Sequence, residues 1–101
     1  MQNRFNIDLL FIELPQSIEA AANRILKILN DSEKAYIRSA KGNQLFFTCY
    51  SLGLEIERAM LDFHEYDTTL YDSLTGKAVP ISQAYNPIIR QLRWRLRYSG
   101  I

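Results

Sequence analysis

The residues of this chain with the most obvious chemistry are Cys49 and His64, its one cysteine and its one histidine. A thiol and an imidazole can form a nucleophile and its general base, provided that they come within hydrogen-bond reach of each other. Apolar residues repeat at helical spacing between them, so both fall on one predicted helix. At about 1.5 Å per residue, this helix holds them about 22 Å apart. We therefore exclude a Cys–His pair within one chain and expect Cys49 to be a buried apolar residue.

Acidic residues near His64 are the next candidates, as metal ligands. Glu57 shares a predicted helix face with His64, and Asp67 follows shortly after. One imidazole and two carboxylates suit zinc or iron. Pairs of metal ligands on a helix are spaced i, i+3 or i, i+4, however, whereas Glu57 and His64 are seven positions apart. We expect no metal site and no bound cofactor.

Catalysis by paired carboxylates meets a similar objection. Glu55 and Glu57 are two positions apart, so on a helix they point to different sides. The chain also contains no glycine-rich phosphate loop and no serine nucleophile elbow. The sequence therefore predicts that the protein is not an enzyme.

Arginines interleaved with aromatic residues crowd the C-terminal end of the chain, where no acid follows Asp72. Arginine, tryptophan and tyrosine are the residue types that most often anchor contacts with partners. The predicted partner interface consists of Arg90, Arg93, Trp94, Arg97 and Tyr98.

Three interpretations of these arginines are open. Cations in the last turns of a helix complement its dipole, and they can also pair with acids elsewhere in the fold. In a protein interface, Trp94 or Tyr98 would be the anchor and the arginines would bind carboxylates in bidentate fashion. Phosphate contact with DNA or RNA would use Arg90, Arg93, Arg95 and Arg97.

Residues 55–72 are rich in acids, against the single arginine Arg58. An acidic patch on a small inhibitor can mimic phosphate or occupy a basic nucleic-acid channel. This segment supplies a second candidate binding surface, made of Glu55, Glu57, Asp62, Glu65 and Asp67.

The composition predicts one globular domain, with 101 residues of which 48% are hydrophobic and 23% charged. The net charge of +1 creates no overall field toward nucleic acid or membrane. A lone cysteine fits a reducing compartment. Asp8 and Glu13 interrupt the N-terminal apolar stretch, unlike in a signal peptide, and no apolar run approaches the ~20 residues of a membrane span. We expect a cytoplasmic protein without membrane contact.

Residues 1–16 are predicted to form an N-terminal arm and residues 17–98 a helical body. The arm shows the alternation that is typical of a strand, with apolar residues at Phe5, Ile7, Leu9 and Phe11. The apolar run that follows leaves a short helix or a packed extended arm as alternatives.

Helical periodicity begins after Ser17, which can cap a helix over about residues 18–30. Asp31 or Ser32 is predicted to cap a second, shorter helix that ends near Ser39. Its apolar contacts are expected from Ala35, Tyr36 and Ile37.

The longest predicted helix covers residues 44–64. Gly53 lies on its apolar stripe, which suggests either that another helix crosses there with its backbone close or that the glycine is merely tolerated. The predicted fold class is all-α or mainly α, a bundle of four to five helices around this long helix.

Residues 65–86 carry weaker signals. Asp67 is predicted to cap a short helix through Leu74, which Thr75-Gly76 closes, and a loop is predicted for Lys77–Tyr85. Asn86-Pro87 then combines an N-cap residue with proline at the first helical position. The last helix is therefore predicted over about residues 87–98.

From Ser17 to about Arg97, the order of features resembles a family of small bacterial helical domains with no assigned function. Its typical elements are a helix ending in L-x-x-x-L, an A-x-I-R segment, a helix carrying L-G-x-x-I-R-N and a final W-x-x-L ending. The counterparts here are Ile25–Leu29, Ala35-Tyr36-Ile37-Arg38, Leu52-Gly53-Leu54-Glu55-Ile56-Glu57-Arg58 and Trp94-Arg95-Leu96. Ile56-Glu57-Arg58 departs from I-R-N. The family also has a turn with two aspartates and a serine before its final helix, and this turn is not recognisable in Pro80–Tyr85. The resemblance implies an all-helical fold and no particular activity.

Together these features predict a small, non-enzymatic bacterial or phage protein that binds another macromolecule as an inhibitor, immunity or adaptor protein. The alternative is a nucleic-acid-binding module that uses the C-terminal arginines. An apolar N-terminal strand could also pair with itself in a homodimer, because an unpaired strand edge accepts a second strand.

Overall fold

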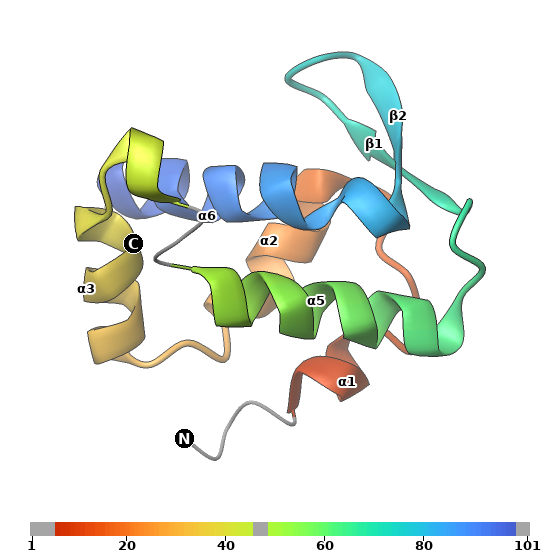
Figure 1. The fold of residues 1–101 in the computed structure, drawn as a ribbon, viewed down its shortest axis with the longest axis horizontal. Helices are drawn as coiled ribbons and strands as arrows, with labels where there is room; N and C mark the ends of the chain where they lie inside the picture. The colour runs from red at the N-terminus through yellow and green to blue at the C-terminus, as the bar shows by residue number, and fades with distance from the viewer. Residues whose placement is uncertain (1–5, 46–48, 99–101) are drawn as a thin grey trace.

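The fold is mainly helical in the computed structural model of the chain, which describes residues 6–45 and 49–98 apart from the side chains of Asn6, Asp8 and Asn43. Figure 1 shows the arrangement of its elements. The helices are α1 (Asn6–Leu10), α2 (Ile18–Leu26), α3 (Asp31–Ser39), α5 (Tyr50–Phe63) and α6 (Tyr85–Tyr98), and the short 3-10 turns are η2 (Gly42–Gln44) and η3 (Ile81–Gln83). The predicted mainly α fold class is confirmed.

The N-terminal segment forms the short helix α1 where a strand was the first prediction. Ile7 and Phe11, one helical turn apart, are 1% and 0% exposed, whereas Leu9 is 66% exposed. A strand would place all three side chains on one face, so the strand prediction is wrong. Arg24 donates to the carbonyl oxygens of Leu10, at 2.6 Å, and Glu13, which lack partners in the helix.

Side-chain caps begin the next two helices. The Ser17 hydroxyl accepts from the amide of Ala20 at 3.0 Å, as predicted for α2. Helix α3 begins at a capping box between Asn30 and Glu33, one residue before the predicted caps. Of the predicted apolar contacts of α3, Ile37 is buried, whereas Ala35 and Tyr36 are exposed.

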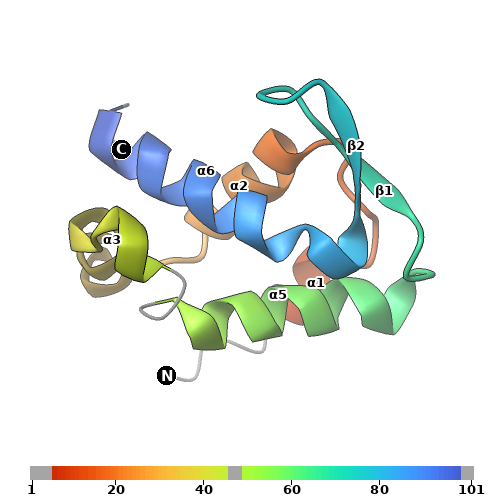
Figure 2. The ribbon, with the colours of Figure 1, turned by 45° about the horizontal axis from the view of Figure 1, so that its top comes forward.

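The long helix predicted over 44–64 appears as α5, with Cys49 at its N-cap and His64 at its C-cap. Residues 46–48 of the prediction lie outside the described residues. Helix α5 buries its apolar stripe through Leu52, Ile56, Ala59 and Met60. It packs on α1 and α6, while α6 packs on α2, α3 and α5 (Figure 2). A bundle centred on residues 44–64 is therefore not confirmed, because α6 contacts more of the described helices.

Gly53 is the point at which α6 crosses α5. A methyl group on its Cα would lie 3.0 Å from Tyr85 Cδ1 and 3.2 Å from Ile89 Cδ1. Both atoms belong to side chains of α6. A helix therefore crosses at Gly53, but the predicted close approach of its backbone is wrong, because side chains of α6 fill the space over the glycine.

Residues 65–86 contain an antiparallel hairpin of β1 (Thr69–Asp72) and β2 (Lys77–Pro80). Gly76 adopts a φ of 72°, and its amide donates to the Asp72 carbonyl at 2.7 Å. The Asp72 carboxylate also accepts from the amide of Leu74 at 3.0 Å. The predicted short helix through Leu74 and the loop over Lys77–Tyr85 are therefore wrong.

Helix α6 begins at Tyr85, two residues before the predicted start. The amide of Ile88 donates to the Ala84 carbonyl at 3.1 Å, so Asn86 and Pro87 both lie in the first turn. Proline fits there because first-turn amides have no partner within the helix.

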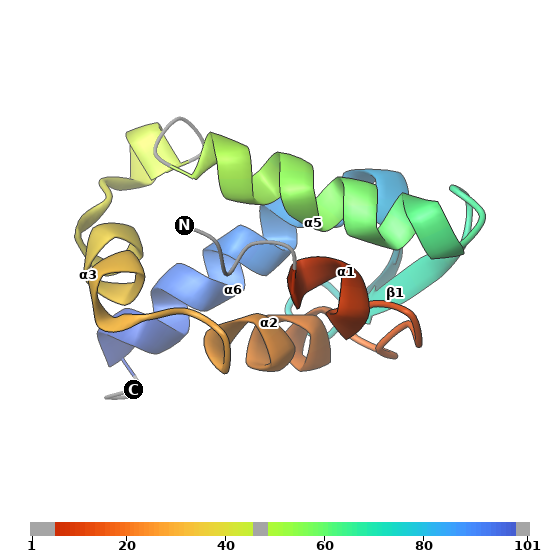
Figure 3. The ribbon, with the colours of Figure 1, turned by 90° about the horizontal axis from the view of Figure 1, so that it is seen from below.

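The remaining described elements pack on two sides of the α5–α6 pair. Helix α1 lies across α2 and α5 on one side (Figure 3), and the hairpin lies on the opposite side, beside α6 and η3 (Figure 1). The C-terminal end of α6 lies next to α3. This leaves one face of α6 between the hairpin and η2.

Candidate functional site

Helix α6 divides sharply into a buried and an exposed face. Its core side chains are Ile88, Ile89, Leu92 and Leu96. Arg90, Trp94 and Tyr98 follow one another at i, i+4 spacing, and all three are exposed. Because residues four apart share a helix face, they form one outward stripe along α6.

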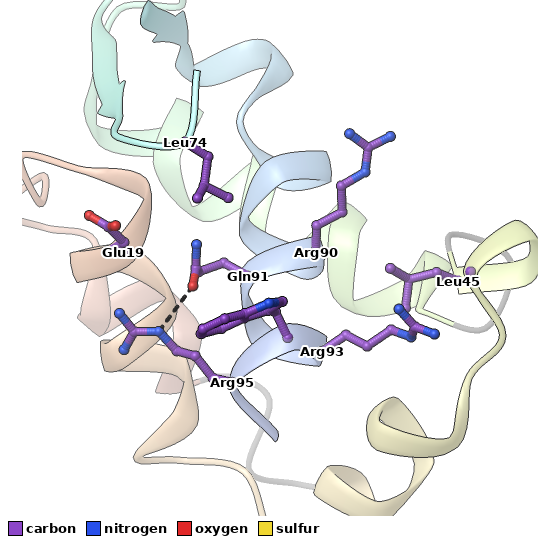
Figure 4. Close-up of a pocket in the computed structure, with 9 residues that line it drawn as sticks. Glu19, Leu45, Leu74, Arg90, Gln91, Arg93 and Arg95 are labelled. Carbon is purple, nitrogen blue, oxygen red and sulfur yellow. Dashed lines mark hydrogen bonds between the residues drawn. The ribbon is translucent and has the colours of Figure 1, made fainter. Parts of the chain in front are cut away.

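A groove with a volume of about 530 Å³ lies over this stripe. Figure 4 shows α6 as its floor, with α2 and the hairpin loop on one side and η2 on the other. We call it the α6 groove; its described lining is Glu19, Gly42, Leu45, Leu74, Arg90, Gln91, Arg93, Trp94 and Arg95.

Two large apolar side chains of the groove face solvent. Trp94 is 55% exposed and Leu74 is 75% exposed. The Trp94 ring packs obliquely on Tyr98, with ring centroids 5.7 Å apart. The hydroxyl of Ser73 donates to the Glu19 carboxylate and so ties the hairpin loop, with Leu74, to the start of α2.

Arg93 and Arg97 reach from α6 to the C-terminal end of α3. The Nε of Arg93 donates to the Ala40 carbonyl at 2.7 Å, and the Nε of Arg97 donates to the Arg38 carbonyl at 2.8 Å. In return, the Nε of Arg38 donates to the Leu96 carbonyl at 3.0 Å. Carbonyls at a helix end carry partial negative charge and lack partners within the helix. These arginines therefore hold α3 against α6.

Arg95 ties α6 to α2 on the other side of the groove. Its Nε donates to Gln91 at 3.2 Å, and its terminal nitrogen donates to Asn23. Gln91 is 4% exposed, so its amide oxygen needs a donor. Arg90 is exposed and extends from α6 away from Arg93 and Arg95 (Figure 4).

The predicted interface residues thus have different positions. Arg90, Arg93 and Trp94 line the α6 groove, and Tyr98 adjoins it through Trp94. Arg97 is not part of the described lining and instead contacts α3. Sequence reasoning missed Leu74, an exposed apolar residue of the lining, because only the hairpin brings it beside α6. The short run Lys77–Pro80, which ends at a proline, is the sequence feature that could have indicated the strand β2.

The predicted acidic surface is divided. Glu55 and Glu57 are half-buried on α5, and the exposed Arg58 follows them. Exposed acids gather at the C-terminal end of α5 and in the turn after it, at Asp62, Glu65 and Asp67. The remaining acid of the segment, Asp72, is buried in the hairpin.

Cys49 and His64 lie at opposite ends of α5, as predicted. Cys49 is 4% exposed, and burial raises the pKa of its thiol. The His64 ring forms a hydrogen bond with the Phe11 carbonyl, with Nε2 2.8 Å from the oxygen. Within residues 6–45 and 49–98, no three ligand-type side chains (His, Cys, Asp or Glu) are placed to hold a metal ion.

Among the described helices, none combines the length and apolar character that crossing a membrane requires. No protein-family model, curated protein or solved structure compared with the chain matches it. The resemblance to small bacterial helical domains therefore stays a prediction.

Proposed function

We propose that this chain is a small, non-enzymatic binding protein of bacterial or phage type, whose α6 groove receives an acidic and apolar segment of a partner protein. It would act as an inhibitor, immunity or adaptor protein, within a cytoplasmic setting. The architecture that we infer for the whole chain is a small helical bundle that presents this groove.

The observation that carries the proposal is the exposure of Trp94 at 55% within a groove. Tryptophan in a concave, partly apolar site is the residue type most enriched among binding hot spots. Leu74 enlarges the exposed apolar area, and the anchored hairpin loop keeps it at the groove edge. A preorganised surface of this kind loses little conformational entropy on binding.

The charge of the groove indicates the chemistry of the partner. Arg90, Arg93 and Arg95 line it together with one carboxylate, Glu19, which already accepts from Ser73. Arg93 and Arg95 use their Nε atoms within the fold, and guanidinium groups carry further donors on their terminal nitrogens. Carboxylates are the groups that such donors bind best in a protein partner.

Photo-crosslinking in the native cell tests the proposal. A benzoylphenylalanine residue replacing Trp94 should yield a discrete adduct with another protein, and Arg90→Glu in the same chain should abolish it. The control places the same residue at Tyr36, which is 61% exposed on α3 and outside the described lining. Equal adducts at both positions, or no adduct at position 94, would contradict a binding role for the groove.

The alternative function is single-stranded nucleic-acid binding. The exposed Trp94–Tyr98 ring pair beside Arg90 supports it, because bases stack on aromatic rings next to cations. Such binding must weaken steeply as salt rises. Titration of labelled single-stranded and duplex oligonucleotides at low and high salt separates the two functions, and no binding at low salt would eliminate this one.

A further inference from the structure

A second exposed apolar patch lies where α1 and α5 end. Ile12 is 50% exposed, Phe63 is 48% exposed and Tyr66 is 69% exposed. The hydrogen bond between His64 and the Phe11 carbonyl joins the two segments at 2.8 Å. Ile12 and Phe63 each directly adjoin a member of that bond in the chain, so the bond brings together the two segments that carry them.

Exposed carboxylates are close to this patch in the chain. Asp62, Glu65 and Asp67 are all exposed and come from the same short stretch as Phe63 and Tyr66. We call the surface the acidic end and define it as Ile12, Asp62, Phe63, Glu65, Tyr66 and Asp67. It combines exposed aromatic rings with negative charge, whereas the α6 groove combines Trp94 and Leu74 with positive charge.

The two surfaces lie in different parts of the molecule. The acidic end lies where α1 and α5 end and in the turn that leads from α5 into β1 (Figures 1 and 3). The α6 groove includes Leu74 of the hairpin loop (Figure 4). No residue of the acidic end belongs to the described lining of the groove, so pairing of the two surfaces requires a second copy.

We propose that the acidic end of one copy docks in the α6 groove of the next, so that the protein associates head to tail with itself. Both surfaces offer apolar side chains, and their charges are opposite in sign, which favours this pairing over groove with groove. An interface between two different surfaces continues into rings or open chains rather than stopping at a symmetric dimer. Self-association then occupies the same groove that the proposed partner uses, and this inference rests on that proposed function.

Two single-face variants test the pairing. The groove variant carries Arg90→Glu with Trp94→Ala, and the acidic-end variant carries Glu65→Lys with Asp67→Lys. All four positions are exposed, and circular dichroism with urea unfolding establishes that both variants stay folded. Sedimentation equilibrium is measured at rising protein concentration, up to about 1 mM to cover weak interfaces. The average mass of the wild type should rise above that of a monomer, and each variant should keep the mass of a monomer.

Mixing the variants gives the sharper result. The acidic end of the groove variant is intact, and so is the groove of the acidic-end variant, so the mixture should form a pair of chains and nothing larger. The groove variant also contains no tryptophan, because Trp94 is the one tryptophan of the sequence. Titrating it into the acidic-end variant should shift the Trp94 emission to the blue, and high salt should weaken the effect.

The other outcomes overturn the proposal. A wild type that stays at one chain up to about 1 mM shows no self-association in the range of weak interfaces. If only one of the two variants loses self-association, the interface joins two copies of the same surface and not the acidic end to the groove. A mixture of the two variants that fails to pair has the same meaning. If self-association fails while the crosslink at position 94 persists, the proposed function stands and this inference alone is wrong.

Discussion

Arg38 and Arg97 each donate a hydrogen bond across the contact between the C-terminal ends of α3 and α6. Arg97 donates to the carbonyl of Arg38 at 2.8 Å, and Arg38 donates to the carbonyl of Leu96, the neighbour of Arg97, at 3.0 Å. Two helix C-termini would otherwise bring partial negative charges together. Part of the arginine cluster that looks like a binding surface in the sequence thus holds α3 against α6.

Removal of Arg93 should destabilise the protein more than removal of Arg97. Arg93→Ala takes the 2.7 Å donor from the Ala40 carbonyl and leaves it with the long 3.5 Å contact from the terminal nitrogen of Arg97, and Ala40 is only 6% exposed. Loss of a partner from a buried polar group costs about 1–3 kcal/mol. Arg97→Ala, at an exposed position, should cost about 1 kcal/mol. Urea unfolding measures both.

The matched control is Arg58→Ala, which removes the same charge from an exposed position on α5. Surface substitutions of this kind stay within about 0.5 kcal/mol. Equal losses for Arg58→Ala and Arg93→Ala would mean that net charge, and not the contact between α6 and α3, determines the effect.

Gly53→Ala should lower the free energy of unfolding by about 1 kcal/mol, although alanine is the better helix former. The new methyl group would lie 3.0 Å from Tyr85 Cδ1 and 3.2 Å from Ile89 Cδ1, and overpacking costs about 1–3 kcal/mol. Gly42→Ala is the control, because its methyl group would meet nothing within 4 Å. Stabilisation by Gly53→Ala would show that the side chains of Tyr85 and Ile89 give way to the methyl group and that overpacking is not the dominant effect.

Gly76→Ala should cost about 1–2 kcal/mol, because a φ of 72° is left-handed and disfavours a Cβ. Gly76→Asn should cost less, since asparagine tolerates this conformation better. Thermal unfolding of the two variants checks the order. If alanine and asparagine behave alike, strain at the turn is not the cause.

Stability should decline above about pH 9 through Cys49. Burial raises the pKa of its thiol above the ordinary value of 9.0, so the folded chain keeps this proton to higher pH than the unfolded chain does. The contribution is complete below the unfolded pKa and is lost as pH rises through the folded pKa. The test compares urea unfolding of wild type and Cys49→Ala from pH 7 to 10.5. Parallel pH curves would mean that the thiol is not buried as described.

The helices that could be predicted are those in which a local sequence signal and the pattern of buried apolar residues indicate the same element. Ser17 and the apolar stripe after it locate α2, and the periodicity around Ile56 locates α5, because cap and burial depend on the same local spacing. The hairpin was missed because a glycine with positive φ ends a helix and closes a turn equally well. Gly76 was assigned to the first role and has the second.

The candidate site could be predicted only in part for a related reason. Arg90 and Trp94 are visible in the sequence because their residue types and spacing suffice to put them on an outward helix face. Leu74 joins them through contacts distant in the chain, such as the Ser73–Glu19 hydrogen bond. The carbonyl partners of Arg93 and Arg97 on α3 also depend on tertiary packing, which local spacing does not encode.

The most direct test of the central claim is the fluorescence of Trp94 while a crosslinked partner, once identified and purified, is titrated into the chain. Because Trp94 is the one tryptophan of the sequence, a tryptophan-free partner or fragment leaves it as the only emitter. Binding in the α6 groove should shift the emission to the blue and protect it from acrylamide, and Arg90→Glu should weaken the titration about tenfold or more. Saturable binding that leaves the emission and the quenching of Trp94 unchanged would contradict the account.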